Sequence, residues 1–371
     1  MVYHIWPHYR AGVVQALDRS ERIAFDFFGS GQALEGIEHL PPGRMRRFVR
    51  APSLRMAGLT WQSGAVGVAL RRRYDAVVYL GDIHFVSTWL GAALCRLRGT
   101  SVLFWAHGWL RAETGVRRRL RDAYYRLANR MLVYSERGAR LGTAAGYPAE
   151  RITTIYNSLD VERADAIVAR IESDELADLS PRALFAAPER PLLVCTARLT
   201  AKCRFDLLID AAARLGAQGL AVNLLLVGEG PERARLEAQA RRLGVTAVFY
   251  GACYDEELIG QFIYHADITV SPGKIGLTAM HSMMYGTPAV THGNLDQQMP
   301  EVEAIVEGRT GAFFRQGDAQ DLARAIAAWL RGGRDRTAVR RACREVIHRS
   351  WNPANQARII EDAILGLVGR G

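Results

Sequence analysis

The stretch PLLVCTARLTAKCRFDLLIDAAARL, residues 191–215, decides the fold class. Residues 191–196 form an apolar run of the length of a buried strand, and residues 205–215 carry apolar side chains at helical spacing. An apolar strand followed by an amphipathic helix is the repeating unit of a parallel α/β sheet. The stretch therefore predicts a βαβ architecture.

The same alternation extends in both directions along the chain. In the second half we expect further strands at 221–227, 248–251, 268–271 and 289–291, and helices at 232–243, 255–265, 276–285 and 318–331. In the first half we expect strands at 2–6, 23–28, 76–80, 101–105 and 130–134, and helices at 12–17, 86–97 and 116–128. The polar segment 161–186 is expected to be a linker.

This pattern predicts two doubly wound α/β domains that face each other across a cleft. We place their boundaries at 1–170 and 171–350, with an amphipathic helix at 351–371 packing back toward the first domain. Ligands of doubly wound sheets bind outside the carboxyl ends of the strands. Functional residues are therefore sought in the loops that follow strands.

Charge is distributed unevenly between the two halves. The 371 residues include 48 basic and 38 acidic ones, and only Lys202 and Lys274 are lysines. Residues 1–170 hold 25 basic and 14 acidic residues, so they carry the whole surplus. Such a domain favours an anionic partner: a membrane surface, a phosphorylated acceptor or nucleic acid. The alternative is an arginine-rich genome that makes surfaces basic without any partner.

The cysteines and the apolar runs indicate the cellular compartment that we expect for the protein. Five scattered cysteines without a CxxC pair are typical of a reducing cytosol. The polar segment after Met1 predicts no secretory signal, and no run reaches the eighteen or so apolar residues of a spanning helix. We expect a cytoplasmic protein whose membrane contact, if any, is peripheral on the inner face of the plasma membrane.

Three loops of the second half form a candidate anion site. Arg198 and Lys202 follow the strand at 191–196, and a guanidinium and an ammonium at this spacing are suited to a diphosphate. Gly228 lies in a Val-Gly-Glu-Gly-Pro turn, which is either a ligand contact or a plain strand-turn-helix link. The run from Lys274 leads through Gly276 into a helix whose first amides can hold an anion. Each loop alone is weak, because surface cations and tight turns are common.

Together these motifs resemble the sugar-nucleotide-binding half of the family-4 glycosyltransferases, retaining enzymes with the GT-B fold of two Rossmann-like domains. The resemblance covers about 191–330, with a weaker match over 106–160. It is carried by Ala-Arg-Leu with Lys202, by the Gly228 turn, by Gly-Leu-Thr at 276–278, by Gly-Thr-Pro at 286–288, and by Pro300-Glu301 with Gly-Arg-Thr-Gly at 308–311.

The resemblance implies a donor site for a nucleoside-diphosphate sugar, with UDP or GDP as the nucleotide and no other cofactor. Arg198 and Lys202 would hold the diphosphate, and the amides of Gly276, Leu277 and Thr278 the β-phosphate. No divalent metal is expected, because those cations neutralise the leaving group.

One departure from the family concerns its two glutamates, eight positions apart, which fall here on Gly273 and His281. We expect His281 to reach a ribose hydroxyl and Lys274 to approach a phosphate or an acidic sugar. The polar run at 291–303 offers Glu301 or Glu303 as a substitute carboxylate, or is a solvated loop.

Acceptor residues are expected in the first half. His107 follows the strand at 101–105, and a histidine there lies by donor sugar and acceptor in the resembled family, where proton transfer is conceivable. Asp82 and His84 follow the preceding strand and are further candidates. The basic stretches at 44–50, 71–73 and 117–121 predict contact with an anionic leaflet, and the first is joined there by the apolar residues Met45, Phe48, Val49, Leu54 and Met56. No nucleic-acid motif accompanies the charge.

These observations favour a hexosyl-type, metal-independent transferase that acts on a saccharide or lipid-linked saccharide in bacterial-type surface polysaccharide or glycan assembly. Two alternatives stay open: a GT-B sugar-nucleotide epimerase or hydrolase, and a catalytically silent homologue that binds the nucleotide or supports an active partner.

Overall fold

The computed structural model describes residues 1–371 except 34–37, 72, 177–179, 370 and 371. The chain divides into two compact units. Unit 1 comprises Met1–Asp160 with Ser350–Gly371, and unit 2 comprises Val161–Arg349. The first boundary therefore lies at Asp160 rather than at residue 170.

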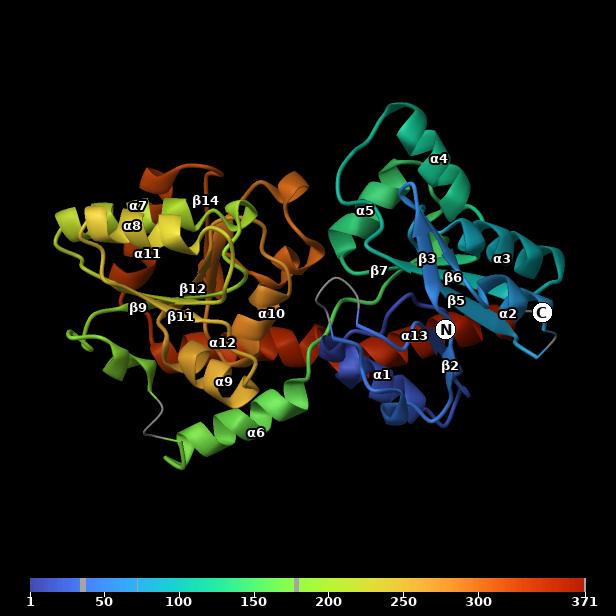
Figure 1. Cartoon of the computed structure of the whole chain (residues 1–371), viewed down its shortest axis with the longest axis horizontal. Helices are drawn as coiled ribbons and strands as arrows, with labels where there is room; N and C mark the ends of the chain where they lie inside the picture. Colours follow the sequence, from blue (N-terminus) through green and yellow to red (C-terminus); the bar gives the residue numbers. More distant parts are fainter. Residues whose placement is uncertain (34–37, 72, 177–179, 370–371) are drawn as a thin grey trace. The chain divides into compact units, whose positions relative to one another are not determined.

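Unit 2 is built on a parallel six-stranded sheet (Figure 1) with the strand order β11-β10-β9-β12-β13-β14. Numbered from the first strand of the unit, this is the order 3-2-1-4-5-6 of doubly wound dinucleotide-binding sheets. The strands are β9 Leu192–Thr196, β10 Asn223–Val227, β11 Ala247–Gly251, β12 Ile268–Ser271, β13 Ala289–His292 and β14 Gly311–Phe314. The predicted α/β class is confirmed.

Helices connect these strands and enclose an apolar core. They are α6 Val161–Glu172, α7 Phe205–Ala217, α8 Arg233–Arg242, α9 Glu256–His265, α10 Leu277–Met284, α11 Ala319–Arg331 and α12 Arg336–Ser350. α11 packs on α7 and β14, and both helices share one core with β9 and β10 through fully buried residues such as Leu208, Leu224 and Ile326. Asp255 and Asp318 begin α9 and α11 by accepting hydrogen bonds from first-turn amides.

Unit 1 has its own parallel sheet, with the order β5-β6-β7-β8. Val2 pairs with both Tyr79 and Phe28 and so links this sheet to the pair β1-β2. The strands are β1 Phe27–Gly29, β2 Phe48–Arg50, β3 Ser53–Met56, β4 Leu59–Gln62, β5 Ala76–Leu80, β6 Ser101–Ala106, β7 Arg130–Val133 and β8 Ile152–Thr154. The helices are α1 Ala11–Asp18, α2 Ala65–Leu70, α3 Val86–Leu97, α4 Gly115–Tyr125, α5 Glu136–Ala144 and α13 Pro353–Val368.

Side chains of β6 alternate between the two faces of this sheet. Leu103 and Trp105 join a core that includes residues of α1 and α13, and Phe104 joins one that includes residues of α2 and α3. Because α13 packs on α1, the expected return of the C-terminal helix to the first domain is confirmed.

Three predicted segments differ from the structure. The strand expected at 2–6 is reduced to a bridge at Val2, because His4 and Trp6 accept backbone hydrogen bonds from loop residues instead of from a strand. The strand expected at 23–28 begins only at Phe27. The linker expected at 161–186 contains α6, whose buried face packs on α9 and α10, while residues 177–179 lie outside the described part.

The basic stretch at 44–50 is also arranged differently from the prediction. Met45 is 4% exposed and belongs to the core, and Phe48 and Val49 are half-buried, so these side chains are unavailable to a membrane. Arg73 of the second stretch pairs with Asp26, and residue 72 lies outside the described part. No helix in the described part of the chain is long and apolar enough to cross a bilayer.

Candidate functional site

The candidate site of unit 2 lies where the strand order of its sheet reverses. β9 and β12 are neighbours there, and both point their carboxyl ends toward the same edge. Arg198 and Lys202 follow β9, Lys202 within the 3-10 turn Ala201–Cys203. Gly273 and Lys274 follow β12 and lead into α10. Switch points of this kind are the ligand sites of doubly wound sheets.

The two loops touch at Gly273. Its amide donates to the carbonyl of Cys203 at 3.0 Å. A Cβ at this position would lie 2.2 Å from the carbonyl oxygen of Lys202, so only glycine permits the approach. The Lys202 turn and the entrance of α10 are thus held against each other.

Gly228 and Gly230 support the Arg198 loop from the other side. A Cβ on Gly228 would lie 2.1 Å from the carbonyl oxygen of Ala197, and one on Gly230 would lie 2.3 Å from that of Leu199. The amide of Leu199 donates to the carbonyl of Glu229 at 3.0 Å. The structure therefore gives Gly228 a packing role beneath Arg198.

Three cations on this edge are open to ligand. Arg198, Lys202 and Lys274 are exposed, and within the described residues no carboxylate lies within ion-pair distance of them. Arg204 and Arg233 nearby are different, because Asp206 pairs with the first and Glu229 and Glu237 with the second. Burial, together with the charge of Lys274, lowers the pKa of His292 at the end of β13.

The N-terminus of α10 completes this group. Gly276 is its N-cap residue, and Leu277 and Thr278 form its first turn, half-buried. Glu301, in the 3-10 helix Pro300–Ala304, is 3% exposed, and its Oε2 lies 3.9 Å from the position of a Cβ on Gly276. Glu303 lies in the same short helix and is half-buried.

Gln298 positions this entrance and was not predicted. Its Oε1 accepts from the amide of Ile275 at 2.7 Å, and its Nε2 donates to Thr291 Oγ1 and to the carbonyl of His292, both at 2.9 Å. Gln298 is 3% exposed. The sequence singled out the polar run at 291–303 without assigning a role to Gln298. In the structure, Gln298 holds the loop that leads into α10.

His281 is held by a carboxylate from another helix. Its Nε2 lies 2.9 Å from Glu256 Oε1 at the start of α9, and the hydroxyl of Tyr285 donates to the same oxygen at 2.8 Å. Burial opposes ionisation of Glu256, but these two hydrogen bonds prevail and lower the pKa of its carboxyl. Only the other ring nitrogen of His281 is left for the predicted ribose contact. Sequence reasoning missed Glu256, which is distant in the chain.

Unit 1 presents its candidates on the carboxyl edge of β5 and β6. Asp82 Oδ1 accepts from the amide of His84 at 2.9 Å and lies 2.7 Å from the ring Nδ1 of His84. Both side chains are exposed. His107 follows β6 directly; part of the residue reaches solvent, but its imidazole packs on Tyr134 and is largely desolvated. Because β5 and β6 are adjacent and parallel, these residues share one edge.

A buried guanidinium lies below His107. Arg10 is 8% exposed, lies within 6 Å of the ring centres of Tyr3, Trp105 and Tyr134, and donates to the Tyr134 hydroxyl at 2.5 Å. The imidazole of His107 packs edge-on to Tyr134, with ring centres 5.2 Å apart. Desolvation and then the Arg10 charge lower the pKa of His107 to about 4. The ring is neutral at pH 7, so it can accept a hydrogen bond but has no imidazolium proton to donate.

Two family matches cover most of the chain. Residues 178–346 match the family described as glycosyl transferases group 1, and residues 19–163 match glycosyltransferase family 4. In solved structures, a glycosyltransferase from Rickettsia africae superposes with a TM-score of 0.75 at 13% identity, covering 100% of this chain and 99% of that one. The chain has the two domains and the fold of the GT-B glycosyltransferases.

Other relatives agree with this GT-B assignment. The Anabaena protein HepE in complex with UDP superposes with a TM-score of 0.72 at 15% identity, covering 98% of this chain and 99% of HepE. A GDP-mannose-dependent phosphatidylinositol dimannoside mannosyltransferase of Mycobacterium tuberculosis is 38% identical over 109 residues, 29% of this chain and 28% of that protein. The sulfoquinovosyl transferase of Arabidopsis thaliana is 28% identical over 45% of this chain and 32% of its own length. The GT-B chain thus spans about a third or less of the length of these two curated relatives.

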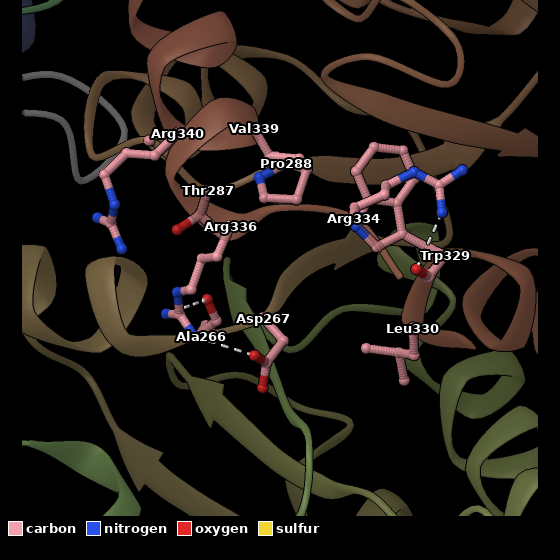
Figure 2. A pocket seen from close by; sticks show the side chains of 11 residues that line it. Ala266, Asp267, Thr287, Pro288, Trp329, Leu330, Arg334, Arg336, Val339 and Arg340 are labelled. Atoms are coloured by element: carbon pink, nitrogen blue, oxygen red, sulfur yellow. Dashed lines mark hydrogen bonds and ion pairs between the residues drawn. The ribbon is translucent and has the colours of Figure 1, made fainter. Parts of the chain in front are cut away.

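A pocket lies at the opposite edge of the unit 2 sheet (Figure 2), and its polar side chains make contacts within the protein. It is lined at the amino ends of β12 and β13 by Asp267 and Thr287, among others. Its arginines are committed to the fold: Arg336 binds Asp267 and backbone carbonyls, Arg334 binds carbonyls of α11, and Arg340 stacks on Tyr264. Within the described residues, no three His, Cys, Asp or Glu side chains are grouped as metal ligands.

Proposed function

We propose that this chain transfers a hexosyl-type sugar from a nucleoside-diphosphate sugar, with UDP or GDP, to a saccharide or lipid-linked saccharide acceptor. One observation carries the proposal: Arg198, Lys202 and Lys274 stand open beside the N-terminus of α10 at the switch point of unit 2. Open cations and free helix amides are the chemistry that a diphosphate needs. The complex of HepE with UDP and the GDP-mannose dependence of the mycobacterial relative support the ligand class.

In the proposed reaction, an acceptor hydroxyl attacks the anomeric carbon of the donor. A new bond forms between carbon and the acceptor oxygen, the bond to the diphosphate oxygen breaks, and the diphosphate leaves with the electron pair. The hydroxyl proton passes to the leaving phosphate or to a nearby base. Arg198 and Lys202 neutralise the charge that develops on the diphosphate, as a divalent cation does in other transferases.

His107 fits the role of a neutral residue beside the acceptor. Its low pKa keeps the imidazole neutral at pH 7, so the ring can accept a hydrogen bond from the attacking hydroxyl, but the same low pKa makes it a weak base for removing the proton. Asp82 and His84, on the same edge, are proposed acceptor contacts. Retention of configuration is proposed from the resemblance alone.

Carboxylates near the donor are proposed to come from Glu301 and Glu256. Glu301 lies at the α10 entrance, and Glu256 reaches His281 from α9. The close approach of Lys202 leaves no room for a side chain at Gly273. This lack of a carboxylate on the loop is what favours the second candidate function, a silent homologue that binds the nucleotide and does not transfer the sugar.

Unit 1 is proposed to receive the acceptor at the inner face of the plasma membrane, in glycan or surface polysaccharide assembly. It holds 25 basic and 14 acidic residues, whereas unit 2 holds 23 and 24. The structural boundary thus assigns the whole surplus to unit 1. A basic unit of this kind suits an anionic membrane or a phosphorylated acceptor.

A thermal-shift panel of UDP, GDP and their sugars tests the donor, followed by product analysis with a lipid-mimic saccharide acceptor. We expect one nucleotide and its sugars to raise the melting temperature, and product to form only when the acceptor is present. Turnover without an acceptor would indicate an epimerase or hydrolase. Binding without any turnover would indicate the silent homologue, and no binding at all would overturn the proposal.

A further inference from the structure

The hairpin β3-β4 of unit 1 stands apart from the main sheet and pairs only with itself among the described strands. Ala57 and Gly58 join its strands, both with left-handed backbone angles, φ +51° and +80°. The antiparallel register sets Leu54 opposite Trp61 and Met56 opposite Leu59. Because side chains alternate along a strand, these four apolar residues share one face.

Polar and apolar residues are reversed in this hairpin relative to an ordinary surface hairpin. The polar Thr60 and Gln62 of β4 are 9% and 1% exposed, and they face the protein. Leu54, Met56, Leu59 and Trp61 are 70%, 75%, 51% and 45% exposed. A surface strand normally buries its apolar face and turns its polar face to water.

Hydrogen bonds explain how the polar face is kept inside. The side chain of Gln62 donates through Nε2 to the carbonyls of Tyr3 and Ala51. Its backbone amide donates to Ser87 Oγ at 2.9 Å. The amide of Thr60 donates to the carbonyl of His84. The hairpin is thus fixed against α3 and the edge of the sheet, so its apolar face is held outward.

The neighbouring helix extends the exposed apolar surface. β4 packs against α3, whose buried side includes Ser87, Gly91 and Cys95. Val86 and Leu90, one turn apart on α3, are 40% and 45% exposed. A group of large exposed apolar side chains on a rigid support marks an interaction surface.

Charge decides between the candidate occupants of this surface. Arg50, just before the hairpin, is exposed, and unit 1 as a whole has 25 basic against 14 acidic residues. A second copy would bring the same positive charge against it, which is unfavourable. An anionic bilayer supplies both an apolar layer and opposite charge, and a tryptophan beside aliphatic side chains is suited to its interface.

We propose that the outer face of β3-β4, formed by Leu54, Met56, Leu59 and Trp61, inserts shallowly into the interface of an anionic lipid bilayer. The inference deepens the proposed function, on which it rests for its biological setting, by naming the surface that meets the membrane. It also places Asp82, His84 and His107 in the unit that is anchored, so that a lipid-linked acceptor would be received by the same unit.

Vesicle flotation tests the proposal with the full chain. The probes are vesicles of phosphatidylcholine alone and of phosphatidylcholine with roughly a third phosphatidylglycerol. We expect recovery of the wild type with anionic vesicles and a loss of at least about tenfold in the variant Leu54→Ser/Met56→Ser/Leu59→Ser. The matched control is Leu184→Ser/Val306→Ser, which removes exposed apolar residues from unit 2 and should float like the wild type.

Several outcomes would overturn the proposal. They are equal flotation of the hairpin variant and the wild type, no flotation of the wild type, or a wild-type dimer in solution that the variant converts to a monomer. Nucleotide-induced thermal shifts, measured without lipid in every variant, separate this inference from the proposed function. Hairpin-dependent flotation without any nucleotide binding would reject the function alone, and nucleotide binding without flotation would reject the membrane surface alone.

Discussion

The two units end their sheets in similar loops but place their cations differently. At the carboxyl edge of unit 2, Arg198, Lys202 and Lys274 are exposed and make no ion pair within the described residues. At the carboxyl edge of unit 1, Arg10 is buried among three aromatic rings, and one of these rings, Tyr134, packs against the imidazole of His107.

The cations of the two units therefore serve different purposes: exposed ones can bind an anion, and a buried one changes the pKa of its neighbours. An exposed cation can exchange water for a ligand anion, and Arg and Lys do so when a phosphate binds. A buried guanidinium on aromatic faces is not available for that exchange, and it acts through its field on the groups around it. Unit 2 is thus suited to binding a diphosphate, and unit 1 to keeping a histidine neutral.

The largest expected effect is on catalysis at the open edge of unit 2. Arg198→Ala should lower turnover by about 10²–10³-fold, because it removes a cation that we propose neutralises the leaving diphosphate. Turnover is measured with the donor that the thermal-shift panel identifies. Arg204→Ala is the matched control, since Arg204 lies on the same loop but is paired with Asp206. Near-native turnover of Arg198→Ala would reject the role of this residue.

A smaller effect is expected where the two donor loops touch. Gly273→Ala places a Cβ against the Lys202 carbonyl, so the loops must separate, at a cost of about 1–3 kcal/mol. We expect a lower melting temperature and weaker nucleotide binding by titration calorimetry. Gly216→Ala in α7 of the same unit is the control, because a Cβ added there meets no atom within 4 Å. Equal nucleotide affinity in both variants would contradict the contact as a determinant of the site.

The course of the chain in unit 2 could be predicted because its signals are local. Apolar runs bounded by glycine or proline predicted β9, β10 and β12, and the loops after them contained Arg198, Lys202 and Lys274. The strand order could not be read from the sequence, since pairing of β9 with β12 joins segments more than seventy residues apart. The order is nevertheless what turns separate motifs into one site.

Features that depend on tertiary contacts were missed. Residues 2–6 are apolar enough for a strand, but loop residues take their backbone hydrogen bonds. Met45 was expected at a basic surface and is in the core. Glu256 meets His281 through a contact between α9 and α10 that the sequence does not reveal. Leu54 and Met56 were expected beside an anionic leaflet, but their place with Leu59 and Trp61 on one face of a hairpin was not predicted.

The smallest expected effect concerns the neutral histidine of unit 1. His107 should titrate near pH 4 when followed by NMR of its ring protons. Replacing Arg10 by Met removes the charge and largely keeps the volume, so the pKa of His107 should rise toward the usual value of about 6.5 without reaching it, because desolvation remains. Arg10→Lys keeps the charge and serves as the control. If the pKa of His107 is the same in Arg10→Met as in the wild type, desolvation alone lowers it. The buried Arg10 would then have no electrostatic effect on His107, contrary to the contrast drawn between the two units.

The sign of the accompanying stability change follows from the same shift. In the unfolded chain His107 has its usual pKa of about 6.5, so between about pH 6.5 and 4 the unfolded state binds more protons than the folded state. The free energy of unfolding should therefore fall as the pH falls through that window, and it should fall less in Arg10→Met because the folded pKa lies closer to the unfolded one. Urea titrations at pH 7 and pH 5 measure this difference. A larger loss in Arg10→Met than in the wild type would mean that Arg10 acts on unit 1 through packing and not through the protonation of His107.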